Sequence, residues 1–209
     1  MKLLLVGATG LVGRHVLELA LADSRVTDVV APVRRALPEH PRLQAPQVDY
    51  ERLPDDAPWW KADAVICTLG TTMKLVGSAE AFRRVDHDYP LAVARLARRH
   101  GTPTYVLNSA MGANSRSLFL YNRVKGELEQ HLEQVGFSSL TLVRPGLIGG
   151  PREDYRRGER AMSKVLSVLD PALPRAWRIN PAATIARALL DAALAPQPGV
   201  HVVASAQLV

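Results

Sequence analysis

Three side chains in the middle of the sequence have types and spacings suited to moving a proton. Tyr121 and Lys125 are four residues apart, one turn of a helix, and Ser109 precedes the tyrosine by twelve residues. A phenol has an ordinary pKa of about 10 and is a weak base near neutral pH, but a neighbouring ammonium group stabilises the phenolate. Lowering that pKa by about three corresponds to about 4 kcal/mol. The three groups predict acid–base chemistry at a carbonyl or alcohol oxygen, which Ser109 would also hydrogen-bond.

A glycine-rich turn near the N-terminus is the second feature that could carry chemistry. Residues 2–6 are mostly large and aliphatic, and they predict a short buried strand that leads into a glycine cluster and then a helix. Gly7 would allow a sharp turn, Gly10 would let the backbone approach a pyrophosphate, and Gly13 would let the helix pack closely against the sheet. The residues expected to hold a dinucleotide here are Gly7, Ala8, Thr9, Gly10, Leu11, Val12 and Gly13.

The glycine spacing leaves two interpretations open. It is Gly-x-x-Gly-x-x-Gly, one residue longer in its first interval than the Gly-x-Gly-x-x-Gly pattern of many dinucleotide sites. Glycines also mark ordinary strand-to-helix turns, so a purely structural turn is the alternative. The position between a strand and a helix favours a phosphate site, because a helix N-terminus offers unpaired N–H groups and a partial positive charge to an anion.

Two arginines indicate which dinucleotide is preferred. Residues 28–33 predict the second strand, and Arg34 and Arg35 follow it directly. In folds of this kind the tip of that strand carries the residue that reads the adenosine ribose, and a guanidinium group suits a 2′-phosphate. Arg34, with Arg35 as a helper, therefore favours NADP over NAD. Two solvated arginines at a strand end are the alternative.

Further strands are predicted at 64–69 and 104–108, and both lead into small or polar residues. Ligands of open α/β sheets bind at the carboxyl ends of the strands. Leu69, Gly70 and Thr71 are therefore expected to line the cofactor crevice, and Ser109 follows the next strand into it. A short third strand is predicted to end at 48–50, where Asp49 either faces the adenine or belongs to a simple turn.

Strands and helices alternate along the chain. Helices are expected over 79–100, 117–135 and 185–195, and two more strands over 140–144 and 199–204. This alternation predicts a Rossmann-like α/β fold, a doubly wound parallel sheet covered by helices on both faces. The length of 209 residues suits a single domain, 1–209, in which residues 147–180 form a small irregular C-terminal lobe that serves as a substrate lid.

The composition argues against several classes of protein. Basic residues give a net charge of +6 but are scattered among acidic ones, and aromatic residues make up only 5%, so nucleic-acid binding is not expected. No apolar run approaches the roughly 20 residues of a membrane span. The single cysteine, Cys67, fits a reducing compartment. We therefore expect a soluble, cytoplasmic protein.

Other reactive residue types have simpler explanations. His15, His87 and His100 are widely spaced and lack partner acids or cysteines in register, so no metal site is expected. Cys67 lies within a predicted buried strand and is expected to be a packing residue rather than a nucleophile. The charged run 152–160 is either a solvated surface or a gate for an anionic substrate.

Together these motifs resemble the short-chain dehydrogenase/reductase superfamily, and most closely its atypical, Tat-interacting-protein-like subgroup. The likeness covers residues 1–150 well and the remainder loosely. Subgroup features occur over 67–72, 82–89 and 121–127. The motifs that carry the likeness are the glycine turn over 7–13, Ser109, Tyr121-x-x-x-Lys125 and Arg144-Pro145-Gly146.

The resemblance implies a doubly wound fold, a bound NADP(H) cofactor and a catalytic set of Ser109, Tyr121 and Lys125. It implies that Tyr121 exchanges a proton with the substrate while hydride moves to or from the nicotinamide, and that Lys125 holds the ribose hydroxyls. It also implies that Pro145 lines the nicotinamide pocket. Many members of the superfamily carry an asparagine that braces the lysine through a water molecule. This chain has Asp86 at the corresponding position, and its carboxylate can hold that water or pair with Lys125.

Two functions from different classes follow from this resemblance. The first is an NADP(H)-dependent oxidoreductase for a small carbonyl compound or its alcohol, because only 65 residues follow Arg144 and a sugar nucleotide would need a larger lobe. The second is an NADPH-binding regulatory or redox-sensing module with little or no turnover. Apolar helix faces leave both a monomer and a homodimer open.

Overall fold

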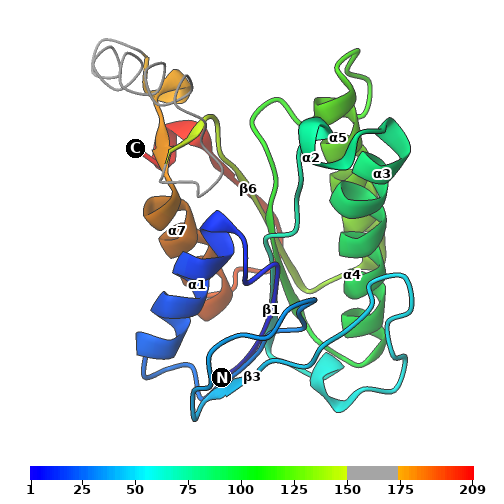
Figure 1. Cartoon of the computed structure of the whole chain (residues 1–209). Helices are drawn as coiled ribbons and strands as arrows, with labels where there is room; N and C mark the ends of the chain where they lie inside the picture. Colours follow the sequence, from blue (N-terminus) through cyan, green and yellow to red (C-terminus); the bar gives the residue numbers. More distant parts are fainter. Residues whose placement is uncertain (150–173) are drawn as a thin grey trace.

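A seven-stranded parallel sheet forms the centre of the molecule (Figure 1). The computed structural model describes residues 1–149 and 174–209. The strand order, β3-β2-β1-β4-β5-β6-β9, reverses direction at β1 and so produces the doubly wound arrangement that was predicted. The strands are β1 (Lys2–Val6), β2 (Asp28–Val30), β3 (Leu43–Gln44), β4 (Ala64–Cys67), β5 (Thr104–Asn108), β6 (Ser139–Arg144) and β9 (Gly199–Ala204).

Helices cover both faces of the sheet. Helices α1 (Leu11–Ala22) and α7 (Ala182–Leu194) pack side by side on one face, and α4 (Tyr89–Arg99) and α5 (Leu120–Val135) lie on the other (Figure 1). The apolar stripes of these helices explain the arrangement, because each helix can bury such a stripe only against the sheet or a neighbouring helix. The Rossmann-like α/β fold expected from the sequence is confirmed.

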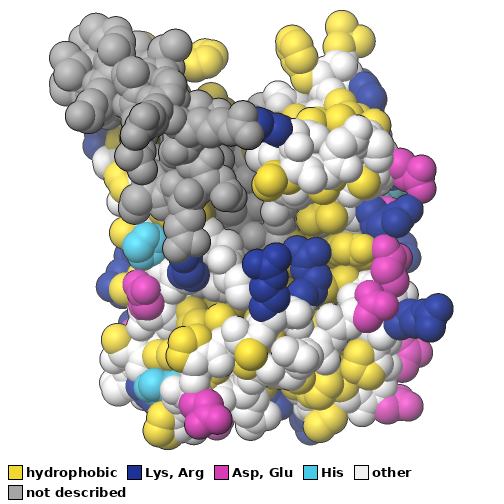
Figure 2. Space-filling model, in the orientation of Figure 1, with side chains coloured by type: hydrophobic (Ala, Val, Ile, Leu, Met, Phe, Trp, Pro, Cys, Tyr) yellow, Lys and Arg dark blue, Asp and Glu magenta, His cyan; other side chains and the backbone are white. Residues whose placement is uncertain are grey.

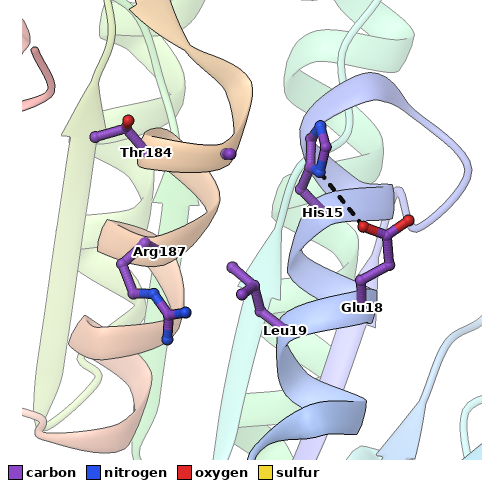
Figure 3. Close-up of a pocket in the computed structure, with 6 residues that line it drawn as sticks. His15, Glu18, Leu19, Thr184 and Arg187 are labelled. Atoms are coloured by element: carbon purple, nitrogen blue, oxygen red, sulfur yellow. Dashed lines mark ion pairs between the residues drawn. The ribbon is translucent and has the colours of Figure 1, made fainter.

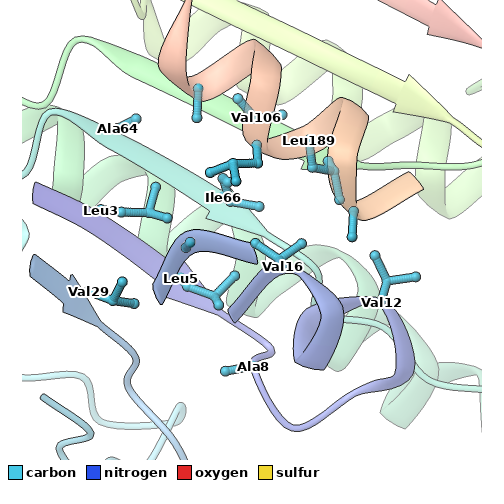
Figure 4. Packing of buried hydrophobic residues seen from close by; sticks show 14 of the residues in the cluster. Leu3, Leu5, Ala8, Val12, Val16, Val29, Ala64, Ile66, Val106 and Leu189 are labelled. Atoms are coloured by element: carbon cyan, nitrogen blue, oxygen red, sulfur yellow. The ribbon is translucent and has the colours of Figure 1, made fainter. Parts of the chain in front are cut away.

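Two hydrophobic cores result from the alternation of side chains along the strands. Leu3, Leu5 and Val106 face α1 and α7, and Figure 4 shows them packed around Ile66 and Leu189. Intervening strand residues, Leu4 among them, face α4 and α5. Because both faces of the strands are buried, they read in sequence as continuous apolar runs rather than alternating ones.

The third strand does not lie where the sequence suggested. The structure places β3 at Leu43–Gln44, paired with Val29 and Val30, whereas a strand ending at 48–50 was predicted. Tyr50 packs over the edge of the sheet: its side chain is buried, and its hydroxyl donates to the carbonyl of Pro32 at 2.8 Å. The Asp49 carboxylate accepts from the Glu51 N–H at 2.9 Å, which is the simple turn role. The parallel pairing nevertheless continues beyond β3, since Val33 bridges Gln47 and the Val48 N–H donates to the Val33 carbonyl at 2.9 Å, so only the last two residues of the predicted strand lie outside it.

The long helix predicted over 79–100 is interrupted. It consists of α3 (Ala79–Arg83), a π-helical stretch η2 (Arg84–Asp88) and α4. A short helix, α2 (Met73–Val76), precedes it and has no counterpart among the predicted elements. π-helical turns frequently occur at functional sites, and this one contains Asp86 and His87, both buried.

The region over 147–180, predicted as an irregular lobe, is only partly described. Residues 150–173, which include the charged run 152–160, lie outside the described residues. The ends of the region meet, because β7 (Ile148–Gly149) pairs with β8 (Asn180–Pro181). The buried Asn180 amide holds them: its oxygen accepts from the Gly146 N–H at 2.7 Å and its nitrogen donates to Ser205 at 3.0 Å.

A pair of histidines, His87 buried and His131 half-buried, joins the π-helical stretch to α5. His87 Nε2 lies 2.8 Å from His131 Nδ1, and His87 Nδ1 lies 2.7 Å from an Asp88 carboxylate oxygen. Both bonds are satisfied with neutral rings when His87 donates to Asp88 and accepts from His131. Protonating His87 would make its Nε2 a donor, so His131 would have to give up its Nδ1 proton for the bond to persist. Burial lowers the pKa of His87, and its hydrogen bond to the Asp88 carboxylate opposes that effect only in part.

The histidine pair predicts a pH-dependent stability. Because the folded-state pKa of His87 lies below its unfolded value near 6.5, the unfolded chain takes up the proton first as the pH falls. The stability that this group confers is therefore complete above about pH 6.5 and lost progressively below it. We expect the Tm of His87→Gln to fall less than that of the wild type between pH 7.5 and 5. The exposed His201→Gln serves as the control, and equal pH slopes in all three proteins would contradict the assignment.

Candidate functional site

The glycine turn between β1 and α1 is built by close backbone contacts. Gly7 has a φ of 87°, a left-handed conformation that side chains disfavour. A Cβ on Gly13 would lie 2.0 Å from the carbonyl oxygen of Gly7, so the helix can approach the strand only with glycine at that position. Thr68, which follows β4, donates its hydroxyl to the carbonyls of Val6 and Gly7 at 3.0 and 3.1 Å. Packing within the protein alone therefore requires two of the three glycines.

The remaining glycine is not explained by packing. A Cβ on Gly10 would meet only the Gly7 carbonyl, at an ordinary contact distance of 3.4 Å, and Thr9 and Gly10 are exposed. Gly10 is also the N-cap of α1, and it offers no side-chain cap to the first N–H groups of that helix. A bare backbone beside open helix amides fits an incoming phosphate. Ala8, Val12 and Gly13 are buried beneath the turn and support it.

Arg34 and Arg35 are exposed just beyond β2. Val33 forms a parallel bridge with Gln47, so the backbone is held up to the residue before the two arginines. Figure 2 shows Lys and Arg side chains gathered near the middle of this face of the molecule. Exposed guanidinium groups beyond a fixed strand end suit a phosphate at the ribose.

A buried ion pair lies under the loop that follows β4. Lys125 Nζ is 2.8 Å from one Asp86 carboxylate oxygen, and the two side chains are only 3% and 1% exposed. The other Asp86 oxygen accepts from the Thr71 N–H at 2.8 Å. A Cβ on Gly70 would come within 3.3 Å of Asp86 and 3.8 Å of Lys125, so Gly70 lies directly over the pair. The structure thus brings Gly70, Thr71 and Lys125 together, with Leu69 half-buried beside them.

The ion pair keeps the lysine charged. Burial alone would lower the pKa of Lys125, but the Asp86 carboxylate outweighs that effect, helped by Tyr121, and the pKa lies above its ordinary value. Lys125 is therefore an ammonium group throughout the neutral range. The Asp86 carboxylate offsets part of the positive potential that this ammonium would otherwise produce at the Tyr121 phenol.

Tyr121 stands at the open end of this arrangement. It lies in the first turn of α5, is 44% exposed, and its ring centroid is 5.9 Å from that of the buried Phe82. Lys125 is one helical turn further along the same stripe, as the spacing predicted. Both lie at the carboxyl edge of the sheet, the edge that also carries the glycine turn.

Ser109 lies outside α5 and contacts the same stripe of that helix at a different position, Glu129. It follows β5, is buried, and donates its hydroxyl to Glu129 at 2.5 Å. Glu129 also accepts two hydrogen bonds from Arg144, at 3.0 and 2.6 Å. Glu129 is eight residues beyond Tyr121, about 12 Å along the helix axis. A role for Ser109 in the chemistry stays a prediction.

The sequence reasoning did not identify Glu129, although a signal was present. Tyr121, Lys125 and Glu129 are spaced at intervals of four and therefore share one stripe of α5. Two buried charged residues on an otherwise apolar stripe demand partners, and the structure supplies Asp86 for one and Arg144 for the other.

Pro145 is buried at the end of β6, one residue beyond Arg144. Its carbonyl accepts from the Met111 N–H at 2.7 Å, which ties the end of β6 to the loop after β5. Both segments leave the carboxyl edge, so Pro145 lies on the side of the site where a nicotinamide pocket was predicted.

Exposed apolar side chains surround this edge. Leu75 follows β4, Leu118 and Phe119 precede α5, and they are 70%, 94% and 76% exposed. Figure 2 shows hydrophobic side chains projecting at the top of the view. Leu147, which follows β6, is also exposed. The edge that carries the candidate site therefore exposes several large apolar side chains.

A surface groove of about 380 Å³ lies elsewhere, between α1 and α7 (Figure 3). His15 and Glu18 face it from α1, with a 3.5 Å ion pair between them, and Thr184 and Arg187 face it from α7. None of the predicted site residues lines the groove. In the described part of the chain, no three His, Cys, Asp or Glu side chains converge as metal ligands would.

Comparison with known proteins extends this description. A family model for NAD(P)H-binding proteins matches residues 7–177. The chain is 35% identical to the fmp52 protein of Emericella nidulans, over 83% of this chain and 79% of that protein. It is 34% identical to HTATIP2 of Rattus norvegicus, over 93% of this chain and 82% of that protein. A solved structure of MoeE5 in complex with UDP-glucose and NAD superposes with a TM-score of 0.75 at 19% identity, covering 97% of this chain and 75% of that one.

The relatives correct the expected location. The fmp52 proteins of Emericella nidulans and Candida albicans are named as mitochondrial, which contradicts the prediction of a cytoplasmic protein. The prediction was wrong because a single cysteine indicates only that the chain forms no internal disulfide. Proteins without disulfides also occur in compartments other than the cytosol. Across residues 1–149 and 174–209, no helix has both the length and the hydropathy to cross a bilayer.

The glycines of the turn predict a separation between binding and folding. Gly10→Ala should weaken NADPH binding at least tenfold while costing at most about 1 kcal/mol as an N-cap change. Gly13→Ala should instead destabilise the fold by about 1–3 kcal/mol or more, since its Cβ would meet the Gly7 carbonyl at 2.0 Å. Fluorescence titration with NADPH and thermal melts of both variants measure the two effects. Unchanged affinity in Gly10→Ala would show that the turn is only structural.

Proposed function

Because the chain belongs to the NAD(P)H-binding family, among the atypical short-chain dehydrogenase/reductases, we propose that it is an NADP(H)-dependent oxidoreductase. Its substrate is a small carbonyl compound or the corresponding alcohol. The observation that carries the proposal is the buried Lys125–Asp86 pair, placed one helical turn from Tyr121 and bonded to the Thr71 backbone. A buried lysine held charged at a ligand-binding edge is a functional arrangement rather than a packing one.

Cofactor binding is assigned to the amino end of α1 and to the loop after β4. The open amides beyond Gly10 would hold the pyrophosphate, and Arg34, with Arg35, would hold the 2′-phosphate of NADP(H). Leu69, Gly70 and Thr71 would line the crevice beyond the turn, Lys125 would reach the ribose hydroxyls, and Pro145 would border the nicotinamide. When bound, the cofactor supplies or accepts the hydride.

Proton transfer is assigned to the Tyr121 phenol. In the reducing direction its O–H donates to the substrate oxygen as that oxygen gains negative charge, and in the oxidising direction the phenolate accepts the alcohol proton. The Lys125 ammonium stabilises the phenolate. Ser109 would bond the same oxygen, and to donate to it the hydroxyl must leave Glu129.

The substrate is expected to be apolar around its carbonyl group. Leu75, Leu118 and Phe119 are exposed around the carboxyl edge near Tyr121, and they offer apolar surface rather than partners for charge. A small apolar aldehyde or ketone suits these surroundings better than a polyanionic sugar nucleotide.

Two observations favour a second function, an NADPH-binding regulatory or redox-sensing module. The Asp86 carboxylate pairs with the charged Lys125 at 2.8 Å, and Glu129 accepts a hydrogen bond from the Ser109 hydroxyl at 2.5 Å. Both contacts would make these residues less available for catalysis, and neither involves the phosphate-binding turn. Turnover with a panel of carbonyl compounds separates the two functions, because a module would bind NADPH and consume none.

Replacing the phenol tests the enzymatic function. Tyr121→Phe should lower kcat by about 10²- to 10⁴-fold, the usual contribution of a positioned acid or base, and leave the Kd of NADPH within about twofold. Tyr89→Phe is a control that also removes a phenol hydroxyl, since that hydroxyl bonds Glu51. NADPH consumption and fluorescence titration report the two quantities. Equal turnover in Tyr121→Phe and the wild type would remove the phenol from the mechanism.

Reversing one charge tests the cofactor preference. Arg34→Glu should raise the Kd of NADPH about 10- to 100-fold and leave that of NADH nearly unchanged, because only NADPH carries the 2′-phosphate. Arg95→Glu, an exposed arginine on α4, controls for net charge. If the wild type binds NADH as tightly as NADPH, the preference for NADP(H) is refuted.

A further inference from the structure

One buried oxygen at the carboxyl edge of the sheet has no hydrogen-bond partner. In the described residues three buried side-chain atoms lack one: Trp59 Nε1, Asn108 Oδ1 and Ser139 Oγ. Ser139 begins β6 and Trp59 lies in a turn before β4, so both are at the opposite edge. Asn108 ends β5, at the edge that carries the candidate site. A buried amide oxygen left unpaired is costly, and native proteins tolerate one mainly where something else supplies the donor.

Strand periodicity shows which face Asn108 occupies. Val106, two residues earlier, belongs to the core that faces α1 and α7, and alternate residues of a strand share a face. In register, Asn108 pairs with Val143 on one side, and on the other it stands beside Thr68, which follows the partner of Leu107. Thr68 in turn bonds the Gly7 carbonyl. A row of neighbours therefore runs from the phosphate turn to Asn108.

Ser109, the neighbouring polar residue, does not have a free hydrogen-bonding group on this face of the sheet. It points to the opposite face, toward α5, and its proton is donated to Glu129 at 2.5 Å. Among the two polar residues at the end of β5, the uncommitted group is the Asn108 carboxamide. It lies two strands from Gly7, about 10 Å at ordinary strand spacing. In a dinucleotide a single ribose lies between the pyrophosphate and the nicotinamide, and the distance that this ribose spans is comparable.

We propose that Asn108 is a cofactor-binding residue, whose buried Oδ1 accepts a hydrogen bond from an N–H or O–H donor on the nicotinamide half of the bound dinucleotide. The proposal rests on the dinucleotide binding assigned above and is independent of turnover. The carboxamide of nicotinamide and the hydroxyls of its ribose are the donors of suitable chemistry.

The test compares a whole cofactor with a fragment. Asn108→Leu keeps the size of the side chain and removes its polar atoms. It should raise the Kd of NADPH at least tenfold and leave that of adenosine 2′,5′-bisphosphate, which lacks the nicotinamide half, unchanged. The Tm should be equal to or higher than that of the wild type, because an unpaired buried oxygen has been removed. Isothermal titration with both ligands and thermal melts provide the readouts.

Ser109→Ala is the matched control, and it should show the opposite behaviour. Loss of its hydroxyl removes a donor from the buried Glu129, so the Tm should fall while the Kd of NADPH stays within about twofold. Equal NADPH affinity in Asn108→Leu and the wild type would overturn the proposal. So would equal weakening of NADPH and of the fragment, because it would indicate a general loss of the fold.

A second variant covers the case in which Asn108→Leu does not fold. Asn108→Asp retains an accepting oxygen and adds a negative charge, which should shift the ratio of affinities toward NADP⁺, whose nicotinamide ring is cationic, and away from NADPH. An unchanged ratio would count against the assignment. The proposed enzymatic function fails separately: a wild type that binds NADPH and turns over no carbonyl compound refutes the enzyme and leaves Asn108 as a binding residue.

Discussion

The buried contact between Lys125 and Asp86 is the interaction on which the candidate site depends. Removing two charges from water is costly, and the cost is offset only where the geometry is close and the remaining oxygens are bonded. Here the ion-pair distance is 2.8 Å and the second carboxylate oxygen takes the Thr71 N–H. The pair therefore connects three segments, the π-helical stretch, α5 and the loop after β4. Loss of either partner would leave an isolated charge in the core.

Three residues on a single stripe of α5 differ in how deeply they are buried. Tyr121 is exposed at the start of the helix, Lys125 is buried one turn later, and Glu129 is buried two turns later. Each buried charge has its own partner, Asp86 for the lysine and Arg144 for the glutamate. The stripe thus passes from an exposed phenol at the carboxyl edge to an ion pair that anchors β6. Asp86 pairs with Lys125 and Glu129 holds the Ser109 hydroxyl, which is why an enzyme and a cofactor sensor both agree with the geometry.

The amino-terminal turn shows how packing and ligand binding can be distinguished at neighbouring residues. Gly7 and Gly13 are required by contacts with Thr68 and with each other, so the fold itself explains them. Gly10 has room for a side chain and still lacks one. The difference arises because neighbouring atoms leave no space for a Cβ on the first and third glycines, whereas the second is exposed at the N-terminus of α1.

Much of this protein was determined by local sequence. The apolar runs at 2–6, 64–67 and 104–108, separated by helical stripes, were enough to predict a doubly wound parallel sheet, and the four-residue spacing placed Tyr121 and Lys125 on one helix face. Only the tertiary structure decided which groups these side chains meet. Asp86 reaches Lys125 across a π-helical turn that no periodicity announced. Ser109 and Asn108, adjacent in sequence, face opposite sides of the sheet, where Ser109 bonds Glu129 and the Asn108 Oδ1 has no partner among the described residues. The physical reason is range: helix and strand periods arise from neighbours a few residues apart, whereas the pairing of buried charges depends on strand register and helix packing between distant segments.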